Sequence, residues 1–502
     1  MKKRLLSVFL CLCMVFSLVP ATVWAETTNG HTHYLCGGST CNGSGHENET
    51  YKTTFEKEIK QEGNTLKIGG ESWASTKGSN DTFYILPTGT YYLGSDISLE
   101  YTIKIENNVT LCLNGHKITA ADGMDAIYMT GGSFTLTDCK GVGTITHASS
   151  KTGRGVYVSS GTFNMYGGSI TGNRATGDGG GVYKSGSNSS FNMYGGSITG
   201  NTANSYGGGV YVYGGGFTMS GGTIGGTKTG ETNTATYGGG GVYAKANFEM
   251  TGGSITGNET NRGGGVYVTG KGSFTMSASA DGQNIPSITG NNATENGGGV
   301  YVVGSSSTFK MTGGSITGNN AYKSDYISTF GGGVCVGSGI FTVSGEVTVT
   351  DNTKGGTKGA DGKFTGDTKN NVYLPTGKTI TIGTDKLSEG AQLGVTVSGD
   401  YGDYPFTSGW NANISDKTPS DYFISDTDGY VAKLNGSELK MVTHVHNWTY
   451  TASGDTITAT CKNCSNNNGN DFSGGSVTIQ KPEKTKFNDG KDENAKVESV
   501  GW

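Results

Sequence analysis

The sequence predicts an all-β fold: a right-handed single-stranded parallel β-helix with a β-rich C-terminal cap and small terminal modules. The first observation is a recurring phrase, clearest as GGGVYKSGSNSSFNMYGGSITGN from 179 to 201. The Val that follows each glycine run falls at 156, 182, 210, 242, 266, 300 and 334, which gives spacings of 26, 28, 32, 24, 34 and 34. Repeats of this length are typical of stacked units and not of one globular core.

The second observation is that each unit contains three short stretches with strand-like alternation. In Val210-Tyr211-Val212 the two valines share a face, and Phe217 and Met219 do the same in the next stretch. The Ile of each Ser-Ile-Thr supplies a third inward residue. Alternation bounded by Gly, Asn and Ser indicates strands, and nothing between them has a helical pattern. We therefore expect coils stacked ~4.8 Å apart, with inward ladders of Val, Phe, Met and Ile.

An asparagine also recurs in the Thr-Gly-Asn turn of the repeat. Stacked amides can bond along the axis, which predicts a ladder. The alternative is that Asn is simply favoured in turns. The regularity favours the ladder, although one coil carries Thr227 at this place. The recurring residues are Asn173, Asn201, Asn258, Asn291 and Asn319.

The ends of the chain differ from the repeats. Residues 1–25 have the pattern of a secretory signal peptide, with Lys2, Lys3 and Arg4 before an apolar run and a small-residue site at Val23-Trp24-Ala25. The run is short for a membrane span, and none is expected after its removal. The remaining chain divides into a polar segment at 26–79, the β-helix at 80–385, a cap at 386–442, a His/Cys hairpin module at 443–475 and a partial β-domain or tail at 476–502.

Composition fits an exported, extended protein. Glycine accounts for 89 of 502 residues, yet the regular apolar positions argue against disorder. The formal net charge is only −5. No basic block indicates a nucleic-acid partner.

Five cysteines lie outside the C-terminal module of the mature chain. Cys36 and Cys41 form either a disulfide or part of a metal clip, and export favours the disulfide. Cys112 and Cys139 fall on adjacent coils, and the sequence leaves two alternatives for them: a disulfide, or two buried free thiols. The mature chain has seven cysteines, so one is left over. We expect it to be Cys335, which occupies the Tyr position of its coil.

The C-terminal module offers a candidate metal site. His444 and His446 precede a predicted hairpin, and Cys461 and Cys464 follow it. Two His and a Cys-x-x-Cys supply the four ligands of a structural zinc site. A Cys461–Cys464 disulfide is the alternative, favoured by export. No other cofactor is expected.

Six tyrosines follow the inward valines and are expected to point outward, one above another. Exposed aromatic rows often form a contact surface. Tyrosine pairs an apolar ring with a polar tip, so the row could stack on an extended glycan, with its middle members mattering most. The alternative is a structural stack that shields the sheet. The six are Tyr157, Tyr183, Tyr211, Tyr243, Tyr267 and Tyr301.

The Gly-Gly-x-Ile and Gly-Gly-Gly-Val-Tyr phrases resemble right-handed β-helix adhesins of the pectate-lyase-like superfold. They are similar to the GGxI repeats of chlamydial polymorphic membrane proteins, although the Phe-x-x-Asn hallmark of that group is not met, since Phe163 is followed by Asn164-Met165-Tyr166. The lead-in at 111–116 and the cap around Tyr422 resemble exported repeat proteins of gut Firmicutes. The resemblance covers about 80–440 and implies a secreted or surface protein.

The resemblance also raises catalysis, because similar β-helices cleave acidic polysaccharides with clustered carboxylates. Asp122 and Asp125, with Asp138 one coil on, come nearest to a cluster, and turn roles explain them more simply. His116 is likewise expected in a turn. We therefore expect no catalytic residues and an adhesin-like protein that binds host or dietary glycans. The alternatives are a scaffold or spacer, and a polysaccharide lyase or glycoside hydrolase.

Overall fold

The computed structural model describes most of the chain between Lys52 and His444. The described residues are 31–34, 52–78, 81–279, 282–322, 329–359, 363–399, 404–410, 418–444, 448–453, 456–461 and 476–480. The predicted signal peptide lies outside them, as do Cys36, Cys41, His446 and Cys464. Among the described residues the one helix is the short α2 (Pro419–Tyr422). None of the helices in this part of the chain is long and apolar enough to cross a lipid bilayer.

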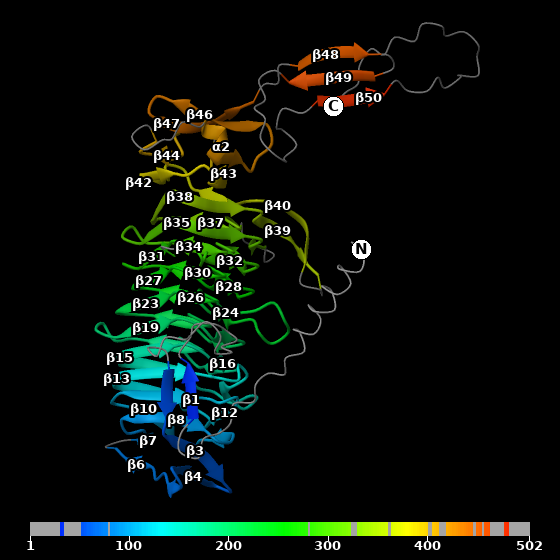
Figure 1. The fold of residues 1–502 in the computed structure, drawn as a ribbon. Coiled ribbons are helices and arrows are strands. Elements are labelled where there is room, and N and C mark those ends of the chain that lie inside the picture. The colour runs from blue at the N-terminus through cyan, green and yellow to red at the C-terminus, as the bar shows by residue number, and fades with distance from the viewer. Residues whose placement is uncertain are drawn as a thin grey trace, which may run out of the picture.

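The chain winds into a parallel β-helix, as predicted, whose coils stack along one axis (Figure 1). Equivalent residues of successive units pair in register, such as Val182 with Val210 and Phe191 with Phe217. The first face contains β7 (Thr82–Ile85), β10 (Thr102–Ile105), β13 (Ile127–Thr137), β15 (Val156–Met165), β18 (Val182–Lys184), β22 (Val210–Val212), β26 (Val242–Ala244), β30 (Val266–Val268), β34 (Val300–Val302), β37 (Val334–Val336) and β41 (Val372–Leu374).

Two further faces complete the predicted coil, and the long strands β13, β15, β35 and β38 each belong to two faces. The second face contains β8 (Gly89–Leu93), β11 (Val109–Cys112), β19 (Ser190–Met193), β23 (Gly216–Met219), β27 (Asn247–Met250), β31 (Ser273–Met276), β35 (Thr308–Thr317), β38 (Ile340–Thr350), β42 (Ile380–Leu387) and β44 (Thr407–Ser408). The third contains β9 (Ile97–Ser98), β12 (Lys117–Ala120), β14 (Thr144–His147), β16 (Ser169–Thr171), β20 (Ser197–Thr199), β24 (Thr223–Ile224), β28 (Ser254–Thr256), β32 (Ser287–Thr289), β43 (Gln392–Val397) and β45 (Phe423–Ser425).

A fourth, narrow sheet follows the asparagine turn and was not predicted. Its parallel strands are mostly two to five residues long, too short to show alternation in the sequence. It closes on an antiparallel hairpin. The strands are β17 (Arg174–Ala175), β21 (Thr202–Ala203), β25 (Thr234–Ala235), β29 (Glu259–Arg262), β33 (Asn292–Asn296), β36 (Asn320–Ala321), β39 (Thr353–Lys358) and β40 (Phe364–Lys369).

The predicted inward ladders form the core. The Val, Phe, Met and Ile of each repeat are fully buried. Phenylalanine rings stack face to face, for example Phe217 on Phe248 with centroids 4.7 Å apart. Because each ring buries its apolar surface against identical rings above and below, the hydrophobic gain repeats in every coil.

The glycine runs are explained by close approach between coils. Gly239, the second of the four glycines before Val242, has a φ of +66°, which side-chain-bearing residues resist. A Cβ on Gly241, the last of the four, would lie 2.6 Å from the carbonyl oxygen of Gly265 and 2.9 Å from Cγ2 of Ile255. The run therefore lets one backbone lie directly against the next.

The parallel pairing continues beyond the predicted boundary at 385, since Leu393 of β43 pairs with Phe423 of β45. An antiparallel hairpin and α2 then form the C-terminal end. At the N-terminal end β3 pairs with both β4 and β8. The strands at these ends are β1 (His31–Tyr34), β2 (Lys52–Phe55), β3 (Lys57–Glu62), β4 (Thr65–Ile68), β5 (Glu71–Ser72), β6 (Thr76–Lys77), β46 (Tyr430–Asn435) and β47 (Glu438–Thr443).

The predicted hairpin after His444 is present as β48 (Trp448–Ser453) and β49 (Thr456–Cys461). β49 also pairs antiparallel with β50 (Ser476–Gln480). The three strands form one sheet. This sheet crosses the boundary expected between 475 and 476.

Candidate functional site

The predicted tyrosines form a continuous row of ring contacts on the first face, most of them stacked or tilted and one, between Tyr243 and Tyr267, edge to face. Each pairs in register with the next, and neighbouring ring centroids lie 4.9 to 5.3 Å apart. The row begins one coil earlier than predicted, because Tyr128 stacks on Tyr157 at 4.9 Å. Sequence reasoning missed Tyr128 since its coil lacks the glycine run. Cys335 takes the next position after Tyr301, as predicted.

The middle of the tyrosine row is covered, and the expectation that all six would be exposed is wrong. Tyr211 is 6% exposed and Tyr243 is 8% exposed, while the others are half-buried. The ring of Tyr206 lies 4.6 Å from that of Tyr243, and Gly207 packs against the Cβ of Tyr211. Burial raises the pKa of Tyr211 and of Tyr243 well above the ordinary value.

A cation covers the N-terminal end of the row. The guanidinium of Arg154 lies 5.5 Å from the ring centroid of Tyr157 and 4.6 Å from that of Tyr183. It is held there by an ion pair with Asp125 at 3.5 Å, and its Nε donates to the carbonyl of Asp178 at 3.0 Å. Arg154 therefore stacks on two rings that a ligand would otherwise reach.

The C-terminal end is similarly occupied. Arg262 forms an ion pair with Glu295 and interacts with Tyr267. Burial raises the pKa of Tyr301 to about 12. The free aromatic surface therefore lies beside the row and not on it.

Three other tyrosines carry that surface, and we call them the tyrosine platform: Tyr206, Tyr213 and Tyr237. Tyr213 is 49% exposed and Tyr237 is 53% exposed. The ring of Tyr206 contacts both Tyr237, at 5.5 Å, and Tyr243 of the buried row, at 4.6 Å. The ring of Tyr213 lies 6.3 Å from Tyr211. The buried row thus forms the floor of an exposed aromatic surface.

Polar groups adjoin the platform. Nζ of Lys245 lies 4.4 Å from the Tyr213 centroid. The Asp178 carboxylate accepts a hydrogen bond from the backbone N–H of Tyr206 at 3.2 Å, and burial raises the pKa of this carboxyl. A flat apolar ring with a carboxylate and an ammonium nearby can stack on a ligand and bond to its hydroxyls.

Sequence reasoning missed the platform although a signal was present. Tyr206 and Tyr237 immediately precede a glycine run, as does Phe330. In the structure Tyr206 pairs along the axis with Gly238, one residue after Tyr237, because four glycines follow Tyr237 and only three follow Tyr206; Phe330 pairs with Asn296. Aromatic residues recurring at one place before the turn could have been read as a second stack.

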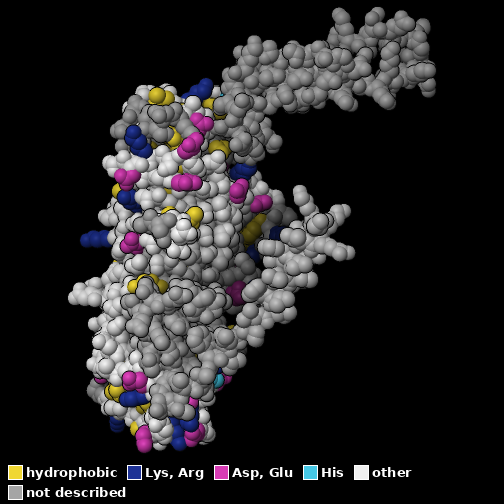
Figure 2. Space-filling model, viewed as in Figure 1, with side chains coloured by type: hydrophobic (Ala, Val, Ile, Leu, Met, Phe, Trp, Pro, Cys, Tyr) yellow, Lys and Arg dark blue, Asp and Glu magenta, His cyan; other side chains and the backbone are white. Residues whose placement is uncertain are grey.

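The third face presents a different surface, made of hydroxyls. In most coils Ser and Thr flank the buried Ile on both sides, and they repeat from coil to coil, with bonds such as Thr199 to Thr171 at 3.3 Å. Figure 2 shows that most of the described surface in the middle of the molecule carries no charged side chain on the face in view. The hydroxyl residues are Thr144, Thr146, Ser169, Thr171, Ser197, Thr199, Thr223, Ser254, Thr256, Ser287, Thr289, Ser315, Thr317, Thr348 and Thr350.

Cys112, Asp138 and Cys139 lie together, with one ligand atom of each within 4.8 Å of the others. The cysteines are held as thiols. The backbone N–H of Asn114 donates to Sγ of Cys112 at 3.3 Å, and Sγ of Cys139 donates to Oδ1 of Asn114 at 3.4 Å. Burial raises the pKa of the Cys112 thiol. The predicted disulfide stays a prediction, with its partners now shown to be neighbours.

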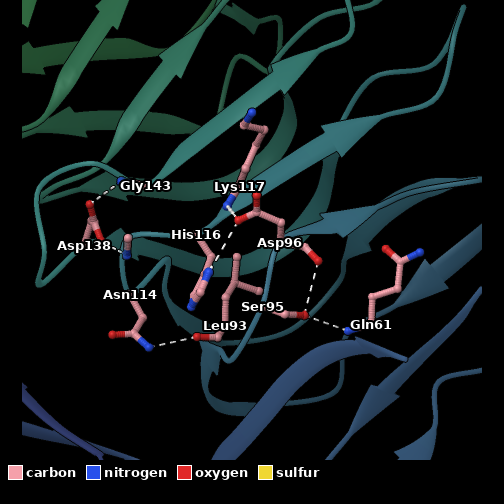
Figure 3. A network of polar contacts seen from close by, with 10 residues as sticks. Gln61, Leu93, Ser95, Asp96, Asn114, His116, Lys117, Asp138 and Gly143 are labelled. Carbon is pink, nitrogen blue, oxygen red and sulfur yellow. Dashed lines mark hydrogen bonds and ion pairs between the residues drawn. The ribbon is translucent and has the colours of Figure 1, made fainter. Parts of the chain in front are cut away.

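The Asp138 carboxylate is already engaged by the backbone. Oδ1 accepts from the N–H of Gly115 and Oδ2 from that of Gly143, both at 2.7 Å (Figure 3). In the same network Nδ1 of His116 lies 3.4 Å from Oδ1 of Asp96, which also accepts from the N–H of Lys117 at 3.0 Å. These groups hold turns together.

The other two acids have similar roles. Asp122 accepts from the N–H of Thr152 at 2.9 Å and from Nζ of Lys151 at 3.1 Å. Asp125 accepts from the N–H of Arg154 at 3.1 Å, and burial raises its pKa. Each carboxylate fixes the turn that leads into β15.

The predicted zinc ligands are only partly within the described residues. The N–H of His444 donates to the carbonyl of Gly429 at 2.7 Å, and Cys461 pairs with Trp448 at the end of the hairpin. His446 and Cys464 lie outside the described residues. The site and its disulfide alternative both stay predictions.

Comparison of the chain with protein-family models, with curated proteins and with solved structures finds no match. The site must therefore be interpreted from its own geometry.

Proposed function

We propose that this protein is an exported, adhesin-like β-helix that binds an extended, uncharged glycan at the tyrosine platform. The observation that carries the proposal is the exposure of Tyr213 and Tyr237 above a floor of stacked, buried tyrosines. Large exposed aromatic rings are costly to leave in water and mark contact surfaces. Their fixed position means that little order is lost on binding.

The partner class follows from the chemistry around the rings. Tyrosine offers a face for a sugar ring and a hydroxyl for hydrogen bonds, while Asp178 and Lys245 supply an acceptor and a donor. Opposite charges so close together favour a ligand without strong net charge. The neutral hydroxyl face is compatible with a polymer that continues along the solenoid.

Export and surface display complete the proposal. They rest on the signal-peptide pattern at 1–25 and on the resemblance of the GGxI repeats to bacterial adhesins. Catalysis is not part of it, because Asp122, Asp125 and Asp138 are each occupied by turn contacts.

The scaffold alternative has its own support. The covered middle of the tyrosine row stabilises the sheet, so the row itself can be purely structural. A spacer would need the row but would have no use for exposed Tyr213 and Tyr237.

Affinity electrophoresis against neutral plant-wall polysaccharides and mucin glycans separates the two. We expect at least one of them to retard the parent protein, and the double variant Tyr213→Ser/Tyr237→Ser to lose the retardation. Tyr404→Ser is the matched control, since Tyr404 is 58% exposed but belongs to the C-terminal end. A parent that no glycan retards, or a double variant that matches it, overturns the proposal.

A further inference from the structure

The predicted asparagine ladder joins the regular coils of the solenoid. Each asparagine but the last donates from Nδ2 to Oδ1 of the asparagine one coil on, at 2.8 to 3.1 Å. The coils before Asn173 lie outside the ladder, and a different polar cluster lies between two of them. The ladder consists of Asn173, Asn201, Asn233, Asn258, Asn291, Asn319, Asn352 and Asn371.

This cluster contains Cys112, Asp138 and Cys139, at the corner between the second and third faces. Cys112 ends β11 and pairs with Thr137, which ends β13, so Asp138 and Cys139 follow directly on the next coil. Later coils have glycines at this corner, and a Cβ on Gly167 would lie 3.0 Å from the backbone nitrogen of Asp138. The repeat pattern therefore does not explain why two thiols and a carboxylate meet here.

The three side chains are spaced as ligands of one metal ion would be. One ligand atom of each lies within 4.8 Å of the other two. In a tetrahedral zinc site sulfur lies ~2.3 Å and carboxylate oxygen ~2.0–2.2 Å from the ion, so ligand atoms are about 3.5–4 Å apart. Small side-chain rotations therefore suffice to bring the three onto one ion. Two sulfur ligands favour a thiophilic cation such as Zn²⁺ over Mg²⁺ or Ca²⁺.

Asn114 supplies a fourth donor atom. Its Oδ1 lies 3.4 Å from Sγ of Cys139, close to the separation expected between two ligands of one zinc ion. The amide is buried and its orientation is fixed, because Nδ2 donates to the carbonyl of Leu93 at 2.9 Å (Figure 3). When Cys139 gives up its proton to bind a cation, the hydrogen bond to Oδ1 is lost, and the cation becomes the new partner of that oxygen.

The carboxylate of Asp138 is buried without a counter-charge. No lysine, arginine or histidine in the described part of the chain forms an ion pair with it. The backbone N–H groups of Gly115 and Gly143 orient the carboxylate but bring no net charge. A carboxylate has about four acceptor sites, so these bonds leave room for an ion. Since a buried charge is costly unless it is paired, a bound cation would stabilise this corner.

We propose that Cys112, Asp138, Cys139 and Asn114 form a structural site for Zn²⁺ that links two adjacent coils near the N-terminal end of the solenoid. Cys112 is fully buried and Cys139 is partly exposed, so the ion enters from the Cys139 side. Each thiol releases one proton to solvent when the ion binds. The same two sulfurs cannot form a disulfide while they hold the ion.

The first test uses the full chain in which every cysteine except Cys112, Cys139 and Cys335 is replaced by serine. Titrated with Co²⁺, a light-absorbing substitute for Zn²⁺, this reduced test protein should bind one ion and show a thiolate-to-cobalt charge-transfer band. Adding Cys139→Ser should abolish the band, whereas adding Cys335→Ser should leave it unchanged. A test protein without the band, or a band that survives Cys139→Ser or disappears with Cys335→Ser, overturns the proposal.

Replacing Asp138 distinguishes this site from a pair of thiols alone. Asp138→Asn keeps the size of the side chain but removes its charge, so we expect the Co²⁺ affinity of the test protein to fall about 10-fold or more. Asp122→Asn is the matched control, because Asp122 also accepts a turn N–H, that of Thr152, but lies outside the cluster. Its affinity should match that of the test protein. An Asp138 variant with undiminished affinity contradicts the assignment of the carboxylate as a ligand.

Protection of the thiols provides a measurement that needs no substitution. In the parent chain, oxidised glutathione can join Cys112 to Cys139 only when the site holds no ion. At a free Zn²⁺ concentration ten times the dissociation constant, the initial rate of this reaction should fall about 10-fold, because only about a tenth of the chains are then free. Mg²⁺ at the same concentration should have no effect. Peptide mapping follows the disulfide, and a rate that Zn²⁺ does not change overturns the proposal.

Discussion

Asn201 and Asn233 bond side chain to side chain, with Nδ2 of Asn201 3.1 Å from Oδ1 of Asn233, although their coil carries an insertion. Asn233 lies nine positions after Ile224, whereas Asn201 lies three after Ile198. The extra residues leave the ladder intact. The expected break at Thr227 is therefore wrong, because Thr227 lies within the insertion.

The first prediction concerns Asn233 and its hydrogen bonds in the ladder. Asn233→Ala should lower the free energy of unfolding by about 2–4 kcal/mol, because it leaves buried groups of Asn201 and Asn258 unpaired. Chemical denaturation measures the change. Asn204→Ala, at an exposed position of the same turn region, should change it by less than about 0.5 kcal/mol. Equal changes in the free energy of unfolding at the two sites would contradict the prediction that the asparagine ladder stabilises the fold.

The solenoid could be predicted because each coil repeats one local pattern, and buried Val, Phe, Met and Ile set the alternation. Asn233 was not recognised as a ladder residue, because the insertion changes its spacing from Ile224 in the sequence without changing its register in the structure. The burial of Tyr211 and Tyr243 could not be predicted either, because the residues that cover them, Tyr206 and the glycine runs of neighbouring repeats, lie outside their own strands. The alternation of a strand shows which side chains face inward, but it does not show which outward-facing side chains are covered by neighbouring turns.

The second prediction tests the close approach of coils. Gly241→Ala should destabilise the fold by several kcal/mol or prevent folding, because the new Cβ meets a backbone oxygen at 2.6 Å. Gly216→Ala is the matched control, since a Cβ there has no heavy atom within 4 Å and its φ is not positive. Its stability should be unchanged or slightly higher. Thermal unfolding followed by circular dichroism would show both, and a harmless Gly241→Ala would refute the packing argument.

The third prediction concerns Lys184, which stands in the inward ladder between Val158 and Val212. It is fully buried, and its Nζ donates to the carbonyls of Gly186, at 3.1 Å, and Gly214. Burial lowers its pKa from 10.5 to about 8. Lys184→Met should therefore raise the free energy of unfolding at neutral pH by about 1–2 kcal/mol.

The sign of its pH dependence follows from the same shift. Between pH 8 and 10.5 the unfolded chain binds a proton at Lys184 that the folded chain does not, so the parent gains stability as pH rises through this window. The advantage of Lys184→Met should be full below pH 8 and fade toward pH 10.5. Denaturant curves of both proteins across this range provide the check, and a constant difference would contradict the shift.

The fourth prediction concerns Cys112 and Cys139. Oxidised glutathione should convert the two thiols into a disulfide, with release of two molecules of reduced glutathione. The reaction should be slow, because burial raises the pKa of Cys112 and little thiolate is present. The bond closes 27 residues (139 − 112) and should add about 3.5 kcal/mol to stability.

Peptide mapping would identify the bond, and Cys112→Ser/Cys139→Ser should show no gain on oxidation. Cys335 should stay unmodified in the folded protein, because it is buried and burial raises its pKa. Oxidation that joins Cys335 in place of this pair would contradict the assignment.

The last prediction separates the two roles of tyrosine. Tyr243→Ser removes a buried ring that contacts Tyr206, Tyr211 and Tyr267, so it should lower the free energy of unfolding by about 3–5 kcal/mol. Tyr237→Ser removes an exposed ring and should change stability by less than about 1 kcal/mol while weakening glycan retardation. Comparing the two variants for stability and for glycan retardation distinguishes the buried tyrosine row from the exposed contact surface. If Tyr237→Ser costs as much stability as Tyr243→Ser and leaves retardation unchanged, the exposed ring belongs to the structural stack and the binding surface lies elsewhere.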